Sequence, residues 1–385
     1  MIELERICRE AAALRSRGVP LLLATVVRVS GSAYRRPGAR MLIAEDRWMA
    51  GSVSGGCLER DILLRGAFHT RGGSPVLVTY DTTSDDDARW GGARGCHGVI
   101  EVLIERIDPR SELDPTHFAS SCFTAEEVGA LATVFASDDP LVPVGARVAA
   151  RRGHVVGSTL PEGTVRDTLA QEALAALVDG ACRARIHLSG RVEALVELFT
   201  PAPHLFVLGT RHDALPLVTL AHAIGLTVTV ADTWAPAATR TQFAAADCLL
   251  FAPPHEIARA VDAHARAAVV VMTHDYERDR DHLAAILGTR ARYIGVLGPR
   301  ARTARMLADA GVKLTDDMLG RLHAPVGLDL GGETPTEIAL AVVAEIQAAL
   351  AGASTRPLRE LPGAIHADER QAAEPNEPHS VEELA

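Results

Sequence analysis

The sequence predicts an α/β protein in which an N-terminal α+β module is followed by a parallel sheet with helices on both faces. Two features carry this prediction. From about residue 204, short apolar runs alternate with amphipathic helical segments, which is the pattern of parallel βα units. Before that point, several apolar runs are joined by turns short enough for β-hairpins. A chain of 385 residues can form two or three domains with sizeable cores.

Composition and charge exclude several classes of partner and site. The net charge is −10 and the sequence pI about 5.8, so we expect no basic surface for nucleic acid or anionic membranes. No apolar run has membrane-spanning length, and residues 1–6 open an amphipathic helix rather than a signal peptide. The six cysteines are scattered without zinc-type pairing, which indicates a reducing cytoplasm and no metal site. Lys313 is the only lysine, which excludes a P-loop.

The first module, residues 1–114, is predicted to combine an opening helix, several strands and a second helix. Apolar residues recur at helical spacing near the start, at Leu4, Ile7, Cys8, Ala11 and Leu14. Strands are predicted over residues 19–29, 40–44, 48–52, 75–80 and 99–105, and a helix over residues 56–68. The acidic stretch 81–92 lacks the EF-hand pattern, so we interpret it as a solvated helix start rather than a metal loop.

A small α+β region is predicted over residues 124–203. A helix begins near Thr164 and follows three strands, and two more strands come after it. The five predicted strands are residues 131–135, 147–151, 154–158, 184–188 and 194–199. Nothing in this region indicates a specific chemistry.

Residues 204–350 have the strand–helix alternation of a Rossmann-like domain. Its strands are predicted over residues 204–208, 226–231, 248–251, 268–272 and 293–297. A capping box that begins at Thr334, with proline at the first helical position, starts the last helix. Residues 352–385 have almost no large apolar side chains, so they are predicted to be a disordered tail that proteases remove without unfolding the rest.

The turn after the first strand of this domain is where a dinucleotide would bind. Gly209 retains the first glycine of the usual motif, and Asp232 stands 23 residues further on, close to the spacing of a ribose-binding acid. Arg211 and Ala214 replace the later glycines, and Arg211 and Asp213 crowd and charge the path of the pyrophosphate. We therefore predict that NAD or NADP binds through Gly209 and Asp232 no more tightly than about millimolar.

The most informative stretch is a glycine- and serine-rich loop that ends near a cysteine, Gly51-Ser52-Val53-Ser54-Gly55-Gly56-Cys57-Leu58-Glu59. Glycine lets backbone N–H groups approach a ligand closely. Cys57 precedes a helical pattern whose dipole favours a thiolate, although a buried structural thiol is an equal alternative. If reactive, it should alkylate faster than the cysteines in apolar patterns, Cys8, Cys122, Cys182 and Cys248. A second glycine-flanked cysteine, Cys96, is open to the same two interpretations.

These stretches resemble motifs of the XdhC/CoxI family, the accessory proteins of xanthine dehydrogenase and carbon monoxide dehydrogenase. Besides the loop at residues 51–59, the N-terminal module carries Gly31-Ser32-Ala33-Tyr34-Arg35-Arg36-Pro37-Gly38-Ala39-Arg40-Met41. In the second half, residues 272–275, 293–298, 325–331 and 333–339 resemble the Rossmann-like module of the family. The resemblance covers residues 19–349 and is weakest in the middle region.

The resemblance implies an accessory protein, not an enzyme, that binds molybdenum cofactor transiently, assists its sulfuration and inserts it into a molybdenum hydroxylase. Expected partners are the apo-hydroxylase, a cysteine desulfurase and, in a homodimer, a second copy of the chain. The implied cofactor-binding residues are Cys57 and Cys96 as thiols, Ser54, Gly55 and Gly56 as backbone donors, and Arg35, Arg36 and Arg40 as phosphate contacts. For the arginines, ordinary surface charge is the alternative.

Two further functions stay open at this point. Gly209 and Asp232 favour an NAD(P)-dependent oxidoreductase, and the altered glycine turn counts against it. A hydrolase centred on Ser54 lacks the G-x-S-x-G frame. His274 and Asp275, at the predicted carboxyl end of a strand, form either a site or a satisfied turn pair.

Overall fold

The computed structural model describes residues 2–31, 35–56, 58–81, 98–108, 110–111, 113–180, 182–188, 192–234 and 239–361. Cys57, Cys96, most of the acidic stretch and the greater part of the predicted tail lie outside the described residues. The chain divides into two compact units. One contains Met1–His204 with Ala223–Thr227 and Ala263–Arg266, and the other contains Leu205–His222, Val228–Asp262 and Ala267–Ala385.

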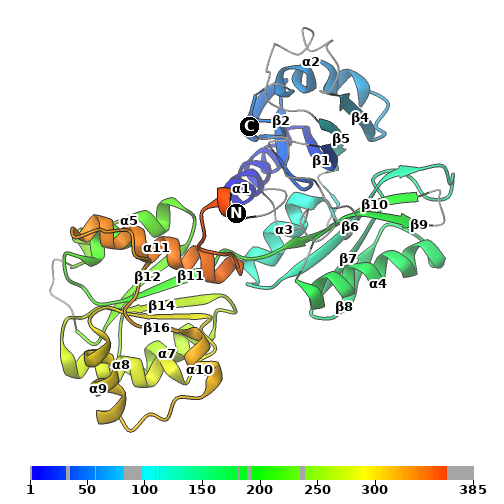
Figure 1. Cartoon of the computed structure of the whole chain (residues 1–385). Helices are drawn as coiled ribbons and strands as arrows, with labels where there is room; N and C mark the ends of the chain where they lie inside the picture. The colour runs from blue at the N-terminus through cyan, green and yellow to red at the C-terminus, as the bar shows by residue number, and fades with distance from the viewer. Residues whose placement is uncertain are drawn as a thin grey trace, which may run out of the picture. The chain divides into compact units, whose positions relative to one another are not determined.

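The first sheet of the N-terminal unit has five antiparallel strands in the order β3-β2-β1-β5-β4 (Figure 1). Its strands are β1 (Leu21–Gly31), β2 (Arg40–Ala44), β3 (Arg47–Gly51), β4 (Val76–Asp81) and β5 (Gly98–Ile107). Helix α1 (Ile2–Ser16) buries Ile7 and Leu14 in a cluster with this sheet, and α2 (Glu59–His69) buries Ile62 in another. The elements predicted for residues 2–107 are thereby confirmed where they are described.

The second sheet of this unit has the order β8-β7-β6-β10-β9 and is also antiparallel. Its strands are β6 (Gly129–Ser137), β7 (Arg147–Arg151), β8 (His154–Ser158), β9 (Arg183–Leu188) and β10 (Val192–Phe199). Helix α4 (Thr164–Asp179) packs Leu169, Ala173 and Ala176 into the apolar cluster of this sheet. These residues form the predicted α+β region, and the boundary between modules 1–114 and 124–203 stays a prediction.

Helix α3 (Pro115–Thr124) lies where the sequence analysis placed no element. The Asp114 carboxylate accepts hydrogen bonds from the Thr116 and His117 N–H groups, and proline occupies the first helical position. This is a recognisable helix-start signal. The prediction missed it because the helix is short and its buried Phe118 and Cys122 supply only one helical repeat.

Buried charges and an apolar cluster join the two sheets of the N-terminal unit. Val27 and Leu103 of the first sheet pack with Phe135 and Leu195 of the second. Ion pairs cross between the sheets at Arg28–Glu193, Arg40–Glu197 and Arg147–Glu105. Removing one partner of such a pair leaves an uncompensated buried charge, so these pairs fix how the sheets meet.

The C-terminal unit contains a six-stranded parallel sheet in the order β13-β12-β11-β14-β15-β16, which confirms the Rossmann-like prediction. Its strands are β11 (His204–Leu208), β12 (Thr227–Asp232), β13 (Cys248–Phe251), β14 (Ala267–Val271), β15 (Tyr293–Val296) and β16 (Leu322–His323). From β11 the strand order runs to β12 on one side and to β14 on the other. The topological switch point, where such sheets bind ligands, therefore lies between β11 and β14.

Helices cover both faces of this sheet (Figure 1). Helices α5 (Ala214–Ala223) and α11 (Pro335–Ala351) lie on one face, and α7 (Pro254–Asp262), α8 (Tyr276–Leu287) and α9 (Arg300–Asp309) lie on the other. Two short helices, α6 (Thr239–Gln242) and α10 (Asp316–Arg321), complete the unit, and a 3-10 turn spans Leu358–Glu360. The capping box that opens α11 is confirmed. Across the part of the chain that the structure describes, no helix is both long and apolar enough to span a bilayer.

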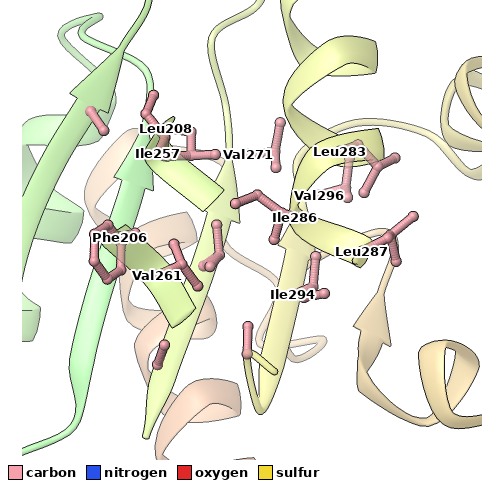
Figure 2. Packing of buried hydrophobic residues seen from close by; sticks show 14 of the residues in the cluster. Phe206, Leu208, Ile257, Val261, Val271, Leu283, Ile286, Leu287, Ile294 and Val296 are labelled. Carbon is pink, nitrogen blue, oxygen red and sulfur yellow. The ribbon is translucent and has the colours of Figure 1, made fainter. Parts of the chain in front are cut away.

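The core of the C-terminal unit lies between the sheet and α7 and α8 (Figure 2). Ile257 from α7 and Leu283 and Ile286 from α8 pack onto Phe206 of β11 and Ile294 of β15. These side chains are all at most 1% exposed. Strands β11, β12, β14 and β15 are buried on both faces, so they form continuous apolar runs in the sequence, which is why they were predictable.

Candidate functional site

The glycine- and serine-rich loop connects β3 to α2, and close backbone packing fixes where it begins. Gly51 has φ of +78°, and a Cβ there would lie 2.1 Å from the carbonyl oxygen of Arg40 on β2. Only glycine fits this approach. Further along, Val53 and Leu58 are buried with Met41 in the core beneath the loop. The loop is therefore anchored to the sheet on both sides of its glycine pair.

The side chain of Glu59, the first residue of α2, folds back into this loop. Its Oε1 accepts hydrogen bonds from the Val53 N–H (3.0 Å), the Ser54 N–H (2.9 Å) and the Ser52 hydroxyl (2.7 Å). Its Oε2 accepts from the Gly56 N–H (2.9 Å) and from the Ser54 hydroxyl. Three N–H groups and two hydroxyls thus converge on one carboxylate.

These hydrogen bonds keep Glu59 charged. Burial raises the pKa of Glu59, but hydrogen bonds from Ser54, Ser52 and loop N–H groups outweigh it and lower the pKa from 4.5 to about 2. The predicted backbone donors Ser54 and Gly56 are therefore engaged by Glu59, and the Gly55 N–H donates to the Ser52 hydroxyl (3.0 Å). The loop is an anion-binding turn whose ligand is a residue of the same chain.

The predicted thiols Cys57 and Cys96 lie outside the described residues, and their roles stay predictions. Both chain neighbours of Cys57 are held in place. The Gly56 N–H donates to Glu59, and the N–H of the buried Leu58 donates to the Ser54 hydroxyl (2.9 Å).

The other four cysteines form two classes. Cys8 and Cys122 are buried, and burial raises the pKa of Cys8 to about 12 and also raises that of Cys122. Burial and a raised pKa both predict slow alkylation of these two thiols, in line with the expectation from the sequence. Cys182 and Cys248 are exposed, so the apolar setting predicted for them is wrong. Cys248 begins the edge strand β13 and Cys182 directly precedes the edge strand β9, and residues at such positions can carry apolar patterns and still face solvent.

The three arginines proposed as phosphate contacts are in different surroundings. Arg40 is 3% exposed, and its Nη2 lies 2.5 Å from the Glu197 carboxylate of the second sheet. Arg35 pairs with Glu3 of α1, and Arg36 is exposed. A role in cofactor binding stays a prediction for all three, and for Arg40 it competes with a buried ion pair.

The two residues of the predicted nucleotide site also have partners within the chain. Gly209 follows β11 with φ of +141°, and a Cβ there would lie 2.5 Å from the Met272 carbonyl oxygen. Asp232 is 1% exposed at the end of β12, and Nη1 of Arg278 lies 3.2 and 3.3 Å from its two oxygens. Burial raises the pKa of Asp232, but the nearby His282 imidazole, the charge of Arg278 and the Thr233 N–H outweigh it and lower the pKa. Nucleotide binding through Gly209 and Asp232 stays a prediction.

A polar pair stands at the carboxyl ends of the strands beside the switch point. Asp213 directly precedes α5, and its Oδ2 lies 2.5 Å from Nε2 of His274, which follows β14. His274 has φ of +59°, a conformation that non-glycine residues seldom adopt. The other oxygen of Asp213, Oδ1, is buried and has no hydrogen-bond partner among the described residues. The adjacent Asp275 caps α8, so His274 and Asp275 serve different purposes.

A second polar cluster lies nearby. Asp279 is 1% exposed and accepts hydrogen bonds from the Thr273 N–H (2.9 Å), the Thr273 hydroxyl (2.6 Å) and Nη2 of Arg302 (2.7 Å). Arg302 belongs to the first turn of α9. This network ties the loop after β14 to the start of α9.

Two cavities lie against these residues. The smaller has a volume of about 190 Å³ and is lined by Asp213, His274 and Glu333 and by apolar residues of α5, α11 and the strand ends. The larger has about 250 Å³ and is lined by Asp279, Gly298, Pro299 and Arg302 among others. Both include Met272, His274 and Leu297, so they form one hollow, which we name the switch-point cleft. Apolar walls with a few convergent polar groups at this place are typical of a ligand site.

Two family models match the chain. The model of the XdhC and CoxI family matches residues 14–81, which include the loop and Glu59. The model of the XdhC Rossmann domain matches residues 205–346, which include the switch-point cleft. A Bacillus subtilis (strain 168) protein, named as a probable subunit of xanthine dehydrogenase, is 31% identical over 326 residues, covering 84% of this chain and 92% of that protein. The chain belongs to the XdhC and CoxI family.

Two further proteins resemble this family member. The Escherichia coli (strain K12) protein named "Uncharacterized protein YqeB" is 28% identical over 211 residues, covering 50% of this chain and 38% of that protein. A crystal structure described as a xanthine dehydrogenase from Bacillus halodurans has a TM-score of 0.72 and 27% identity, covering 92% of this chain and 98% of that one. The fold is thus shared across nearly the whole length of both chains.

Sequence reasoning missed the roles of Glu59, Asp213 and Arg302. Each carries a local signal, because Glu59 is an acid in the first turn of a helix after a glycine loop, and the other two follow strands of a parallel sheet. Which group each one meets depends on the fold, and no local pattern supplies it.

Proposed function

We propose that this protein binds molybdenum cofactor transiently, assists its sulfuration together with a cysteine desulfurase, and delivers it to the apo-form of a molybdenum hydroxylase in the cytoplasm. The observation that carries the proposal is the loop before α2, where five donors hold one anionic group. The cofactor offers metal-bound oxo and sulfido groups to such donors, and Cys57 offers a soft sulfur ligand. The names of two similar proteins, both referring to xanthine dehydrogenase, support this assignment.

Glu59 suits a carrier that must also release its cargo. An anion that enters the loop competes with the Glu59 carboxylate for the N–H groups of Ser54 and Gly56. The competition lowers the affinity for the cargo, and the returning carboxylate satisfies the donors after delivery. Cys57, between Gly56 and Leu58 in the sequence, would then meet the cargo where the loop opens.

The test compares Cys57→Ala with Cys248→Ala, which removes an exposed cysteine of the C-terminal unit. Each protein is produced in cells that make molybdenum cofactor, and three quantities are measured: the molybdenum retained per folded chain, the activity restored to an apo-hydroxylase, and the melting temperature. Cys57→Ala should lose most retention and transfer while melting like the parent, because a small residue still fits after two glycines.

The opposite result would assign a structural role to Cys57. If Cys57→Ala retains and delivers cofactor like the parent but is about 1–3 kcal/mol less stable, the thiol is a structural core group. Transfer would then be assigned to other residues, and the proposal for Cys57 would be wrong. Cys248→Ala should behave like the parent in all three measurements, because its thiol is exposed.

A further inference from the structure

We propose that the switch-point cleft of the C-terminal unit binds the pterin ring of the molybdenum cofactor, with the amino-substituted edge of the ring at Asp213 and the phosphate end toward Arg302. The inference rests on the proposed function, because the cleft by itself indicates only a small, donor-bearing ligand with an anionic end. It is carried by three observations: the volume and apolar lining of the cleft, the acceptors at the smaller cavity, and the cation at the larger one.

The smaller cavity has an apolar lining and a volume that suit a small ring system. Leu217 of α5, Val342 of α11 and Val270 of β14 are among its apolar lining residues, and among the described residues its only ionisable lining groups are Asp213, His274 and Glu333. Its volume of about 190 Å³ is below the range of roughly 300–1,000 Å³ that is usual for drug-sized ligands. A bicyclic ring matches such a space better than a dinucleotide does.

The polar groups of the smaller cavity are hydrogen-bond acceptors. Asp213 Oδ1 is buried and lacks a donor among the described residues, although Oδ2 already holds His274. When the His274 imidazole is neutral and donates from Nε2, its Nδ1 is an acceptor too. Glu333 adds a carboxylate at the start of α11. A ligand edge rich in N–H groups, such as the amino-pyrimidinone edge of a pterin, would satisfy these acceptors.

The opposite polarity is found in the larger cavity. Arg302 lines it from the first turn of α9, together with Gly298 and Pro299 that lead into this helix. Asp279 fixes the arginine with one hydrogen bond, and a guanidinium has further N–H donors to offer. A phosphate is therefore favoured at this end and disfavoured beside Asp213 and Glu333. Asp279 lines this cavity too, but its oxygens already accept hydrogen bonds from Thr273 and Arg302. The cation at this end and the unpartnered Asp213 Oδ1 at the other therefore give the ligand one orientation.

The standard dinucleotide position is different from this cleft. It would use Gly209 and Asp232, and neither residue lines the two cavities. Asp232 ends β12, which lies on the opposite side of β11 from β14 in the strand order. Arg278 holds its carboxylate there. The two sites can therefore be distinguished by mutation.

The test uses the full chain, the fluorescent probe 6-hydroxymethylpterin and purified molybdenum cofactor. Asp213→Asn keeps the shape of the side chain and an oxygen for His274, but it puts an amide N–H₂ where the ligand needs an acceptor. Binding of both ligands should weaken about 10- to 100-fold, the loss expected for a hydrogen bond to a charged group. Ala339→Leu, which places extra carbons on a buried lining residue of α11, should weaken binding of the probe as well. Asp317→Asn, an exposed acid on α10, is the matched control and should bind like the parent.

Each alternative outcome overturns a defined part of the argument. If the parent binds the pterin probe and both cleft variants bind it equally well, the ring sits elsewhere and this inference is wrong, while the proposed function stands. If the parent delivers cofactor but does not bind the probe, the cleft does not recognise a pterin. Displacement of the probe by NADH at micromolar concentration would assign the cleft to a nucleotide. If pterin binding depends on Asp213 but no hydroxylase is ever activated, the ring site stands and the delivery function fails.

Discussion

The loop before α2 and the switch-point cleft differ in whether their polar groups have hydrogen-bond partners within the chain. In the loop, hydrogen-bond donors predominate, and the chain's own Glu59 carboxylate occupies them. In the cleft, acceptors predominate, and Asp213 Oδ1 is buried without a donor among the described residues. A buried polar atom without a partner costs about 1–3 kcal/mol, whereas a satisfied one costs little. The loop donors are therefore satisfied by the chain itself, whereas the cleft keeps a buried acceptor that the proposed ligand would satisfy.

The largest effect is expected at the support of the loop. Arg40→Ala should lower the free energy of unfolding by about 3–5 kcal/mol, because it leaves Glu197 as an uncompensated buried charge. The measurement is urea-induced unfolding at pH 7, with midpoint and slope compared to the parent. Arg36→Ala, at an exposed position, is the control and should change stability by no more than about 0.5 kcal/mol.

A different outcome would change the role of Arg40. If Arg40→Ala is as stable as the parent and loses cofactor, the arginine is a phosphate contact, as the resemblance to the family implies. The loop would then not depend on the ion pair between the two sheets, and the contrast with the cleft would be weaker.

The next effect concerns the internal ligand of the loop. Glu59→Gln should lower the free energy of unfolding at pH 7 by about 1–2 kcal/mol, a value reduced from the full pKa shift because the carboxylate is partly solvated. Since the folded pKa of about 2 is below the ordinary value of 4.5, the stabilisation is fully present above pH 4.5 and is lost as the pH falls toward 2.

Unfolding measured between pH 7 and pH 2.5 separates the two proteins. The difference between parent and Glu59→Gln should shrink steadily below pH 4.5. A difference that stays constant over this range would mean that the ionised carboxylate is not what holds the loop. Glu256→Gln, in the first turn of α7 with an exposed side chain, serves as the control and should show little change at any pH.

The third prediction addresses the C-terminal unit. Calorimetry with NAD and NADP should give dissociation constants no better than about millimolar, because Arg211 crowds the turn and Asp232 already holds Arg278. A micromolar constant would contradict this and would favour the oxidoreductase interpretation. Competition with the pterin probe then shows whether the nucleotide occupies the cleft or the turn at Gly209.

The smallest effect is expected from the end of the chain. Limited proteolysis should remove residues beyond Gly352 without changing the melting temperature, because this segment offers few apolar groups to offset the entropy of ordering. Mass spectrometry of the protected core, followed by melting, makes the measurement. Protection of this segment from the protease would mean that it docks on the protein, which would contradict the prediction of a disordered tail.

Most of the secondary structure follows from local signals in the sequence. The alternation from residue 204 onward gave the parallel sheet, and Thr334 with its proline and glutamate marked the start of α11. These signals are local, because a cap or a turn involves residues that are neighbours in the chain. Helix α3 is the exception. Asp114 and Pro115 provide its cap, but its apolar repeat is too short to predict a helix.

The partners of the polar residues, in contrast, depend on the tertiary fold. Arg40 meets Glu197 across two sheets, Asp213 meets His274 across two strand ends, and Asp232 is held by Arg278 from α8. The residues in these pairs are 157, 61 and 46 positions apart in the chain. The sequence does not show whether a charged side chain contacts a ligand, solvent or another charge. A buried charge needs a partner because it has lost contact with water, and the fold determines which partner is within reach.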